Sequence, residues 1–157
     1  MSRLLRVLWL EDNDDDVVLL KRAIKALAAP IKLWRVNDGL EACDFLQGSG
    51  KYMNREAYPL PDLIISDLKM PNMNGIQFVA WLRKQPKFAA TPLLIFSTSG
   101  LMREIDEAVE KGAGRYWVKP NALDRWNSTV REIFEHASQL LAGVRRADQA
   151  DRSEAIL

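Results

Sequence analysis

The segment Leu63-Ile64-Ile65-Ser66-Asp67 is a short apolar run that ends in a carboxylate. Pro61 lies just before the run, and a helical spacing of apolar residues begins only after Asn74. A short apolar run with such borders is typical of a strand buried on both faces of a parallel sheet. We therefore expect a strand over Leu63 to Ser66, which places Asp67 at the carboxyl end of that strand.

The same pairing of an apolar run with a helical pattern occurs along the rest of the chain. Further strands are expected over Leu4 to Leu10, Ile31 to Val36, Leu93 to Phe96 and Arg115 to Val118. Helices are expected from Asp14 until Pro30, over Gly39 to Gln47, Asn74 to Gln85 and Leu101 to Lys111, and from near Ala122 onward. Five strands alternating with five helices predict an α/β protein with a parallel sheet covered on both faces and right-handed crossovers.

The length, net charge and cysteine count of the chain limit the kinds of protein that it can be. A length of 157 residues suits one domain, and 22 basic against 21 acidic residues give a net charge of +1. This balance gives no support for binding nucleic acid or a membrane. The single cysteine, Cys43, excludes an internal disulfide and is expected to point inward with Leu40 and Leu46. The apolar run Val7 to Leu10 is too short for a signal peptide or membrane span, so a cytoplasmic protein is expected.

Polar residues with distinct chemistry follow four of the predicted strands. In open parallel sheets, ligands bind at the carboxyl ends of the strands. The residues at those ends are Glu11 and Asp12, Asp67, Ser97 and Thr98, and Lys119 followed by Pro120. Each has an ordinary alternative when taken alone: a solvated loop acid, a hydroxyl that satisfies backbone, or a surface lysine. Their joint arrival at four strand ends favours one functional cleft.

The acids at these ends predict a cation and a phosphoryl acceptor. Three carboxylates in one cleft repel each other, and a divalent cation with oxygen ligands, such as Mg²⁺, relieves that repulsion. Asp67 can accept a phosphoryl group covalently, and the cation can neutralise one phosphoryl oxygen, Lys119 a second, while the hydroxyl of Ser97 donates to a third. By contrast, we expect Asp14 to Asp16 only to favour the dipole of the helix that they begin.

At this point the motifs resemble the receiver domain of bacterial two-component response regulators. The matching segments are Leu10-Glu11-Asp12-Asn13, Ile64 to Pro71, Gly75, Ser97-Thr98-Ser99 and Val118-Lys119-Pro120, within a match that covers residues 4–142. The resemblance implies a flavodoxin-like (βα)5 doubly wound sandwich with a five-stranded parallel sheet of order 2-1-3-4-5. It also implies a phosphoacceptor protein that catalyses only its own phosphorylation and dephosphorylation.

The resemblance implies a role for each site residue. Asp67 would be the phosphoacceptor, and Lys119 would pair with the phosphoryl group. Mg²⁺, for which Mn²⁺ or Ca²⁺ could substitute, would be held by Asp67, by Asp12 directly, by Glu11 mostly through water, and by the backbone carbonyl of Lys69. Ser97 would be the switch hydroxyl and Tyr116 the switch aromatic. Ser97 replaces a commoner threonine, and Thr98 is bulkier than the residue often found there.

The same resemblance suggests partners. Three features resemble stand-alone receivers that partner bacterial phytochrome histidine kinases: Glu11-Asp12-Asn13 followed by Asp15 and Asp16, the long loop before Pro61, and Ser97-Thr98-Ser99. Residues 143–157 are expected to form a short polar tail without an output domain, so a downstream target or phosphotransfer protein is expected. Candidates for a homodimer face on the last strand and last helix are Trp117 or Tyr116, Trp126, Phe134, Leu141 and Val144. The alternative for the four helix residues is that most of them pack on the sheet of their own chain.

Two other functions compete with a phosphorylatable receiver. An aspartyl phosphatase usually needs an acid two residues after its nucleophile, where this chain has Lys69. An interaction module that works without phosphorylation would not need the full set of acids, hydroxyl and lysine.

Overall fold

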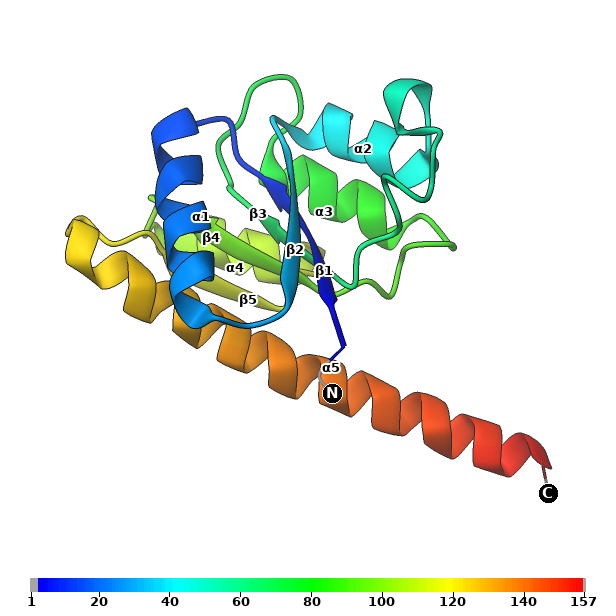
Figure 1. The fold of residues 1–157 in the computed structure, drawn as a ribbon. Coiled ribbons are helices and arrows are strands. Elements are labelled where there is room, and N and C mark those ends of the chain that lie inside the picture. Colours follow the sequence, from blue (N-terminus) through cyan, green and yellow to red (C-terminus); the bar gives the residue numbers. More distant parts are fainter. Residues whose placement is uncertain (1–2, 157) are drawn as a thin grey trace.

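The fold is a five-stranded parallel sheet with helices on both faces (Figure 1). The structure is a computed structural model that describes residues 3–156, apart from the side chains of 145–149 and 151–156. The strand order is β2-β1-β3-β4-β5, as expected for the flavodoxin-like arrangement. The strands are β1 (Leu5–Leu10), β2 (Ile31–Val36), β3 (Leu63–Ser66), β4 (Leu93–Ser97) and β5 (Arg115–Val118).

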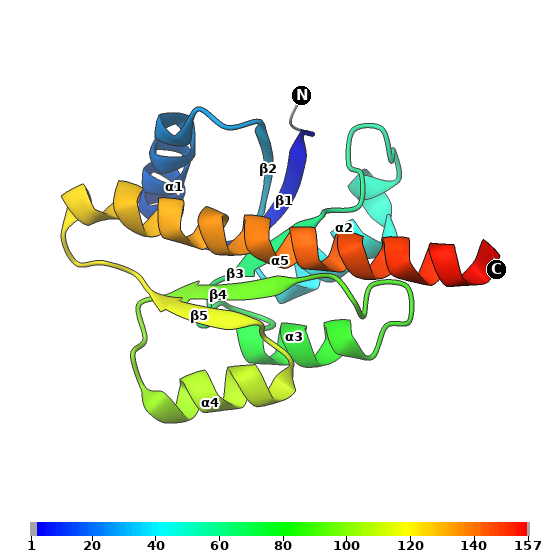
Figure 2. The same cartoon turned by 90° about the horizontal axis from the view of Figure 1, so that it is seen from below.

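The helices form two layers, which Figure 2 shows on opposite sides of the sheet. Helices α1 and α5 pack against each other on one face, while α2, α3 and α4 cover the other. The helices are α1 (Asp14–Leu27), α2 (Gly39–Gln47), α3 (Gly75–Arg83), α4 (Met102–Lys111) and α5 (Trp126–Ile156). Short 3-10 turns are η1 (Gly50–Tyr52) and η2 (Leu123–Arg125).

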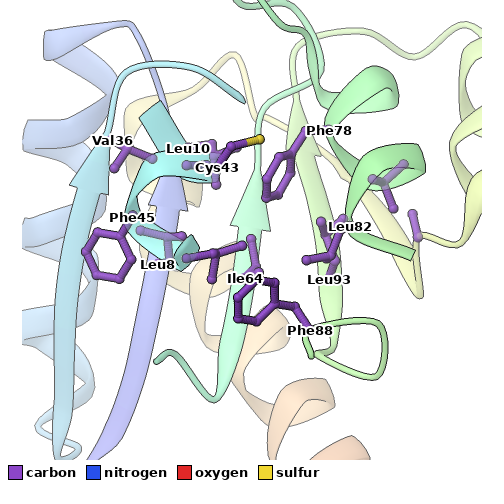
Figure 3. Packing of buried hydrophobic residues seen from close by; sticks show 14 of the residues in the cluster. Leu8, Leu10, Val36, Cys43, Phe45, Ile64, Phe78, Leu82, Phe88 and Leu93 are labelled. Atoms are coloured by element: carbon purple, nitrogen blue, oxygen red, sulfur yellow. The ribbon is translucent and has the colours of Figure 1, made fainter. Parts of the chain in front are cut away.

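The central strands are apolar on both sides because each face of the sheet is covered. Every residue of β3 and β4 is buried, and alternate residues enter the two cores. Figure 3 shows the core under α2 and α3, in which Ile64 lies between Phe45 on one side and Phe78 on the other. Cys43 and Leu46 belong to this core as expected, but the inward placement of Leu40 was wrong, because half of that side chain is exposed.

Side-chain caps fix where three helices begin. The side chains of Asn13, Asp38 and Asn74 accept hydrogen bonds from backbone N–H groups in the first turns of α1, α2 and α3. Such caps satisfy donors that a helix start leaves without partners. Because each of these helices is the next helix after a strand end, the caps also fix the far ends of the loops in which the polar residues lie.

Helix α5 corrects two expectations about the dimer face. Trp126 and Phe134 are almost fully buried against the sheet and α1, so neither is available to a second copy. The helix also continues past Leu141 to Ile156, and its end projects beyond the sheet in Figures 1 and 2. Most side chains of the expected tail, and Leu157, lie outside the described residues. Among residues 3–156, no helix has both the length and the apolar character needed to cross a membrane.

Candidate functional site

The register of the sheet brings the polar strand ends together. Leu10 of β1 pairs with Ser66 of β3, so the next residues, Glu11 and Asp67, lie side by side. The backbone N–H of Asp67 donates to the carbonyl of Leu10 at 2.9 Å, which ties the two ends. Parallel strands share one carboxyl edge, and this edge therefore carries both acids.

The other half of the site comes from β4 and β5. Ser97 pairs with Val118, and the backbone N–H of Lys119 donates to the carbonyl of Ser97 at 2.7 Å. The Lys119 side chain then runs across the edge of the sheet toward the acids, and only 2% of it is exposed. The predicted strand-end lysine is thus a buried cation and not a surface residue.

The ammonium of Lys119 lies among three carboxylates. Its Nζ is 2.6 Å from Glu11 Oε2 and 2.8 Å from both Asp67 Oδ2 and Asp16 Oδ2. An ammonium has three N–H donors, so these contacts use all of them. A buried cation with full hydrogen bonding to acids is held in one position, next to the carboxylate of Asp67.

The charge balance of this cluster changes the protonation of its members. Burial lowers the pKa of Lys119, but Asp67 and Glu11 outweigh that effect, so its pKa lies above the ordinary value. Burial raises the pKa of Glu11 to about 7, because Lys119 offsets the lost hydration only in part and Asp67 adds repulsion. The cluster holds more negative charge than one ammonium neutralises, and it therefore favours a second cation or a proton.

The donor set of the cluster fits a hard divalent cation. Carboxylate oxygens of Glu11, Asp12 and Asp67 all lie within 4.8 Å of one another. Glu11 and Asp67 are buried, while Asp12 is exposed, so the cluster opens to solvent on one side. Oxygen ligands with an open side suit Mg²⁺ or Mn²⁺, which retain waters and accept further oxygens. The three acids form an acidic cluster typical of a metal site.

The loop after Asp67 is fixed from two sides. Asp67 Oδ1 accepts a hydrogen bond of 2.6 Å from the backbone N–H of Leu68, which leaves Oδ2 to face Lys119. Gly75 packs directly on this loop, since a Cβ at that position would lie 2.3 Å from the carbonyl oxygen of Asp67. The glycine is therefore needed for a close approach. Lys69 lies in the same loop with its side chain exposed, and the ligand role of its carbonyl stays a prediction.

The remaining predicted residues lie along β4 and β5. Ser97 is fully buried at the end of β4. Tyr116 is half-buried, and its hydroxyl donates to the carbonyl of Ser99 at 2.6 Å. Trp117 points into the core under α5, while Tyr116 lies on the opposite face of β5 and packs, half-buried, against the core under α2 and α3, so neither aromatic faces fully outward. Ser97 and Tyr116 thus frame the loop after β4, and their switch roles stay predictions.

One site residue was missed from the sequence. Asp16 was expected only to favour the dipole of its helix, yet its carboxylate contacts Lys119, more than 100 positions away in sequence. Its neighbours Asp14 and Asp15 are exposed as expected, and Asp14 pairs with Arg35. Three consecutive acids look alike in a sequence, and only the rotation of α1 against the sheet selects one of them.

Comparisons with known proteins agree with this site. The family model described as response regulator receiver domain matches residues 7–131. The structure of the phosphorylated cyanobacterial phytochrome response regulator RcpA has a TM-score of 0.78 at 28% identity, covering 85% of this chain and 93% of that one. RPA3017, a response regulator in red light signaling of R. palustris, also has a TM-score of 0.78 at 28% identity, covering 83% and 92%.

A third relative has been solved with a metal. Response regulator Rcp1 of Synechocystis sp. is 29% identical over 117 residues, which cover 74% of this chain and 78% of Rcp1. The structure of the Mn²⁺-bound form of Rcp1 has a TM-score of 0.74 at 28% identity and covers 82% of this chain and 91% of that one. Because the family model matches most of this chain, the chain belongs to the response regulator receiver domains. These domains are phosphoacceptor signalling proteins of two-component phosphorelays and not classical enzymes.

Proposed function

We propose that this protein accepts a phosphoryl group from a sensor histidine kinase onto Asp67. The observation that carries the proposal is the position of Asp67 Oδ2, 2.8 Å from the buried ammonium of Lys119 and within the cluster of Glu11 and Asp12. A carboxylate with one oxygen held by backbone and the other beside a fixed cation is oriented as a nucleophile. Receiver domains partner with sensor histidine kinases, and the family match supports such a donor.

The proposed reaction is a transfer from nitrogen to oxygen. A carboxylate oxygen of Asp67 attacks the phosphorus of a phosphohistidine, and an O–P bond forms while the N–P bond breaks. The electron pair of the broken bond stays on the imidazole nitrogen, which takes a proton. Lys119 would move its donor from the carboxylate to a phosphoryl oxygen, and the hydroxyl of Ser97 would donate to another. Fixed donors of this kind stabilise charge that develops during transfer.

The acidic cluster would hold Mg²⁺ for this reaction. Glu11, Asp12 and Asp67 supply carboxylate oxygens, and the carbonyl of Lys69 is the proposed further ligand. The cation neutralises charge on the phosphoryl oxygens when it is bound. Mn²⁺ could take the same place, as the Mn²⁺-bound form of the relative Rcp1 suggests, and Ca²⁺ is a further candidate.

Phosphorylation of Asp67 would change a protein-binding face near β5, and a partner protein would recognise that change. Ser97 and Tyr116 are the proposed switch pair, because phosphorylation that draws Ser97 toward the phosphoryl group would change the space beside Tyr116. Exposed apolar side chains of the kind that partner surfaces use lie close by in sequence, at Leu101, Met102, Val118 and Leu123. A homodimer over the last strand and helix would use this region, and a downstream target or phosphotransfer protein is the alternative partner.

Similarity to phytochrome response regulators suggests the kind of kinase. RcpA and RPA3017 cover most of this chain, and their names tie them to light signalling. We therefore propose a bacteriophytochrome as the sensor kinase, with both proteins in the cytoplasm. Phosphotransfer from a panel of purified kinases would identify the donor by its rate.

Incubation with acetyl phosphate and Mg²⁺ tests the central step. The intact mass should increase by one phosphoryl group in the native protein and in Asp15→Asn, whose carboxylate is exposed near the site, and should not change in Asp67→Asn. A native protein that gains no phosphoryl group under these conditions would count against the proposal.

A further inference from the structure

Asp16 is the one acid around Lys119 that lies outside the metal-type cluster. Its Oδ2 is 2.8 Å from Lys119 Nζ, as close as Asp67 Oδ2 is. The cluster of mutually close acids among the described residues consists of Glu11, Asp12 and Asp67 and does not include Asp16. The carboxylate of Asp16 therefore binds the ammonium of Lys119 without also belonging to the cation site.

The local structure fixes the direction of this carboxylate. Asp16 is the third residue of α1, and its backbone N–H donates to the side chain of Asn13 at 3.1 Å, so the cap sets the rotation of the first turn. Only 20% of the Asp16 side chain is exposed, against 88% for Asp14 two positions earlier. The first turn thus turns one of its acids toward the site and leaves the others in solvent.

The contacts of Lys119 cannot all persist during the proposed reaction. Two of its three partners, Glu11 and Asp67, are also candidate ligands for a divalent cation, and Asp67 becomes an acyl phosphate. Lys119 would then share Glu11 with the cation and exchange the Asp67 carboxylate for a phosphoryl oxygen, in the state in which the position of this flexible side chain matters most. Asp16 is the partner of Lys119 for which neither the cation nor the phosphoryl group competes.

We propose that Asp16 is a positioning residue, which holds the Lys119 ammonium beside Asp67 while Glu11 and Asp67 are engaged by the cation and the phosphoryl group. The proposal rests on the proposed function of Asp67. It assigns no contact between Asp16 and the phosphoryl group, since Asp16 acts only through Lys119. Loss of the carboxylate would leave Lys119 with one charged hydrogen bond fewer and free to move toward the acids of the cluster.

The rate of phosphorylation by acetyl phosphate measures this role. In that step an oxygen of Asp67 forms a bond to phosphorus, and the bond from phosphorus to the acetyl oxygen breaks. The acetyl oxygen keeps the electron pair of the broken bond, and the leaving group is acetate. At saturating Mg²⁺, Asp16→Asn should react about tenfold more slowly than the native protein, the scale expected for one charge-assisted hydrogen bond. Asp16→Glu keeps the charge and should recover part of the rate.

Asp15→Asn is the matched control, because it removes the same charge from the same helical turn and Asp15 is exposed. A role limited to the helix dipole would lower the melting temperatures of Asp15→Asn and Asp16→Asn alike and leave their rates equal. The Mg²⁺ dissociation constant, measured by calorimetry without phosphodonor, should rise more in Asp16→Asn than in Asp15→Asn, since Lys119 then competes more strongly for the cluster acids.

The outcomes separate the two proposals. The positioning role of Asp16 is overturned, and that of Asp67 stays intact, if the native protein is phosphorylated while Asp15→Asn and Asp16→Asn have equal rates and equal Mg²⁺ affinities. A native protein that is not phosphorylated overturns the proposed function itself. Should Asp16→Asn fail to fold, Asp16→Ser is compared with Asp15→Ser by rate, and equal rates overturn the positioning role.

Discussion

Replacing Lys119 with methionine would leave the buried acids of the site without their cation. Glu11 and Asp67 are buried, and both contact the ammonium within 2.8 Å. Removing one partner of a buried ion pair typically costs about 3–5 kcal/mol of unfolding free energy, because the remaining charge is uncompensated. Without divalent cations at pH 8, we expect Lys119→Met to lose stability on that scale.

The pH dependence of this loss identifies its cause. In the native protein the pKa of Glu11 is already raised to about 7, and removal of the ammonium would raise it further. An acid whose folded-state pKa exceeds its unfolded value costs stability increasingly as pH rises from the unfolded pKa to the folded one. The difference between variant and native protein should therefore be small near pH 5 and large at pH 8. Added Mg²⁺ should reduce it at pH 8, since a cation again neutralises the acids.

Urea unfolding followed by circular dichroism measures these differences, with the midpoint as readout. Lys21→Met is the control, because Lys21 is an exposed lysine of α1 and its replacement should change stability by less than about 0.5 kcal/mol. If Lys119→Met matches the stability of the native protein at pH 8 without Mg²⁺, then Lys119 is not the counter-ion of a buried acid cluster and the reasoning fails.

Three further results are expected. Gly75→Ala should lose about 1–3 kcal/mol of unfolding free energy and should accept the phosphoryl group more slowly, because its Cβ would lie 2.3 Å from the Asp67 carbonyl oxygen. Gly143→Ala, which has open space around its Cβ, should gain about 0.5–1 kcal/mol. Urea midpoints and phosphorylation rates check both variants. Burial raises the pKa of Glu41, but hydrogen bonds from Tyr52 and Asn37 outweigh this effect, so the folded-state pKa lies below its ordinary value. The free energy of unfolding should therefore fall as pH drops through the folded-state pKa of Glu41, and Glu41→Gln should flatten this part of the pH–stability curve. Chelation of divalent cations by EDTA should stop phosphorylation by acetyl phosphate, and excess Mg²⁺ should restore it, as followed by intact mass.

The strands were the most predictable part of the fold. The bounds of β2, β3 and β5 agree with the sequence prediction, and β4 differs only by the inclusion of Ser97. Strands buried on both faces consist almost wholly of apolar residues, so their ends are marked by the first polar residue. The same property located Glu11, Asp67 and Lys119, because the functional residues of this fold begin where the apolar runs end.

Features that depend on the rotation of helices were not predictable. Trp126 and Phe134 share the stripe of α5 with residues that must be buried, and periodicity alone does not tell whether a long stripe packs on its own sheet or on a second copy. Leu40 was placed inside on spacing, but the turn that begins α2 leaves it exposed. Asp16 was missed for the same reason, since its contact with Lys119 exists only once α1 has packed beside α5 on the sheet.

The location of the phosphoryl group tests the central claim most directly. Borohydride reduces an aspartyl phosphate to homoserine, which marks the modified residue for peptide sequencing by mass spectrometry. After treatment with acetyl phosphate and Mg²⁺, the account predicts homoserine at position 67 and at no other acid of the cluster. Homoserine at Asp12 or Asp16, 5-hydroxynorvaline (the alcohol from a reduced glutamyl phosphate) at Glu11, or no reduced acid at all in protein that has gained a phosphoryl group, would contradict it.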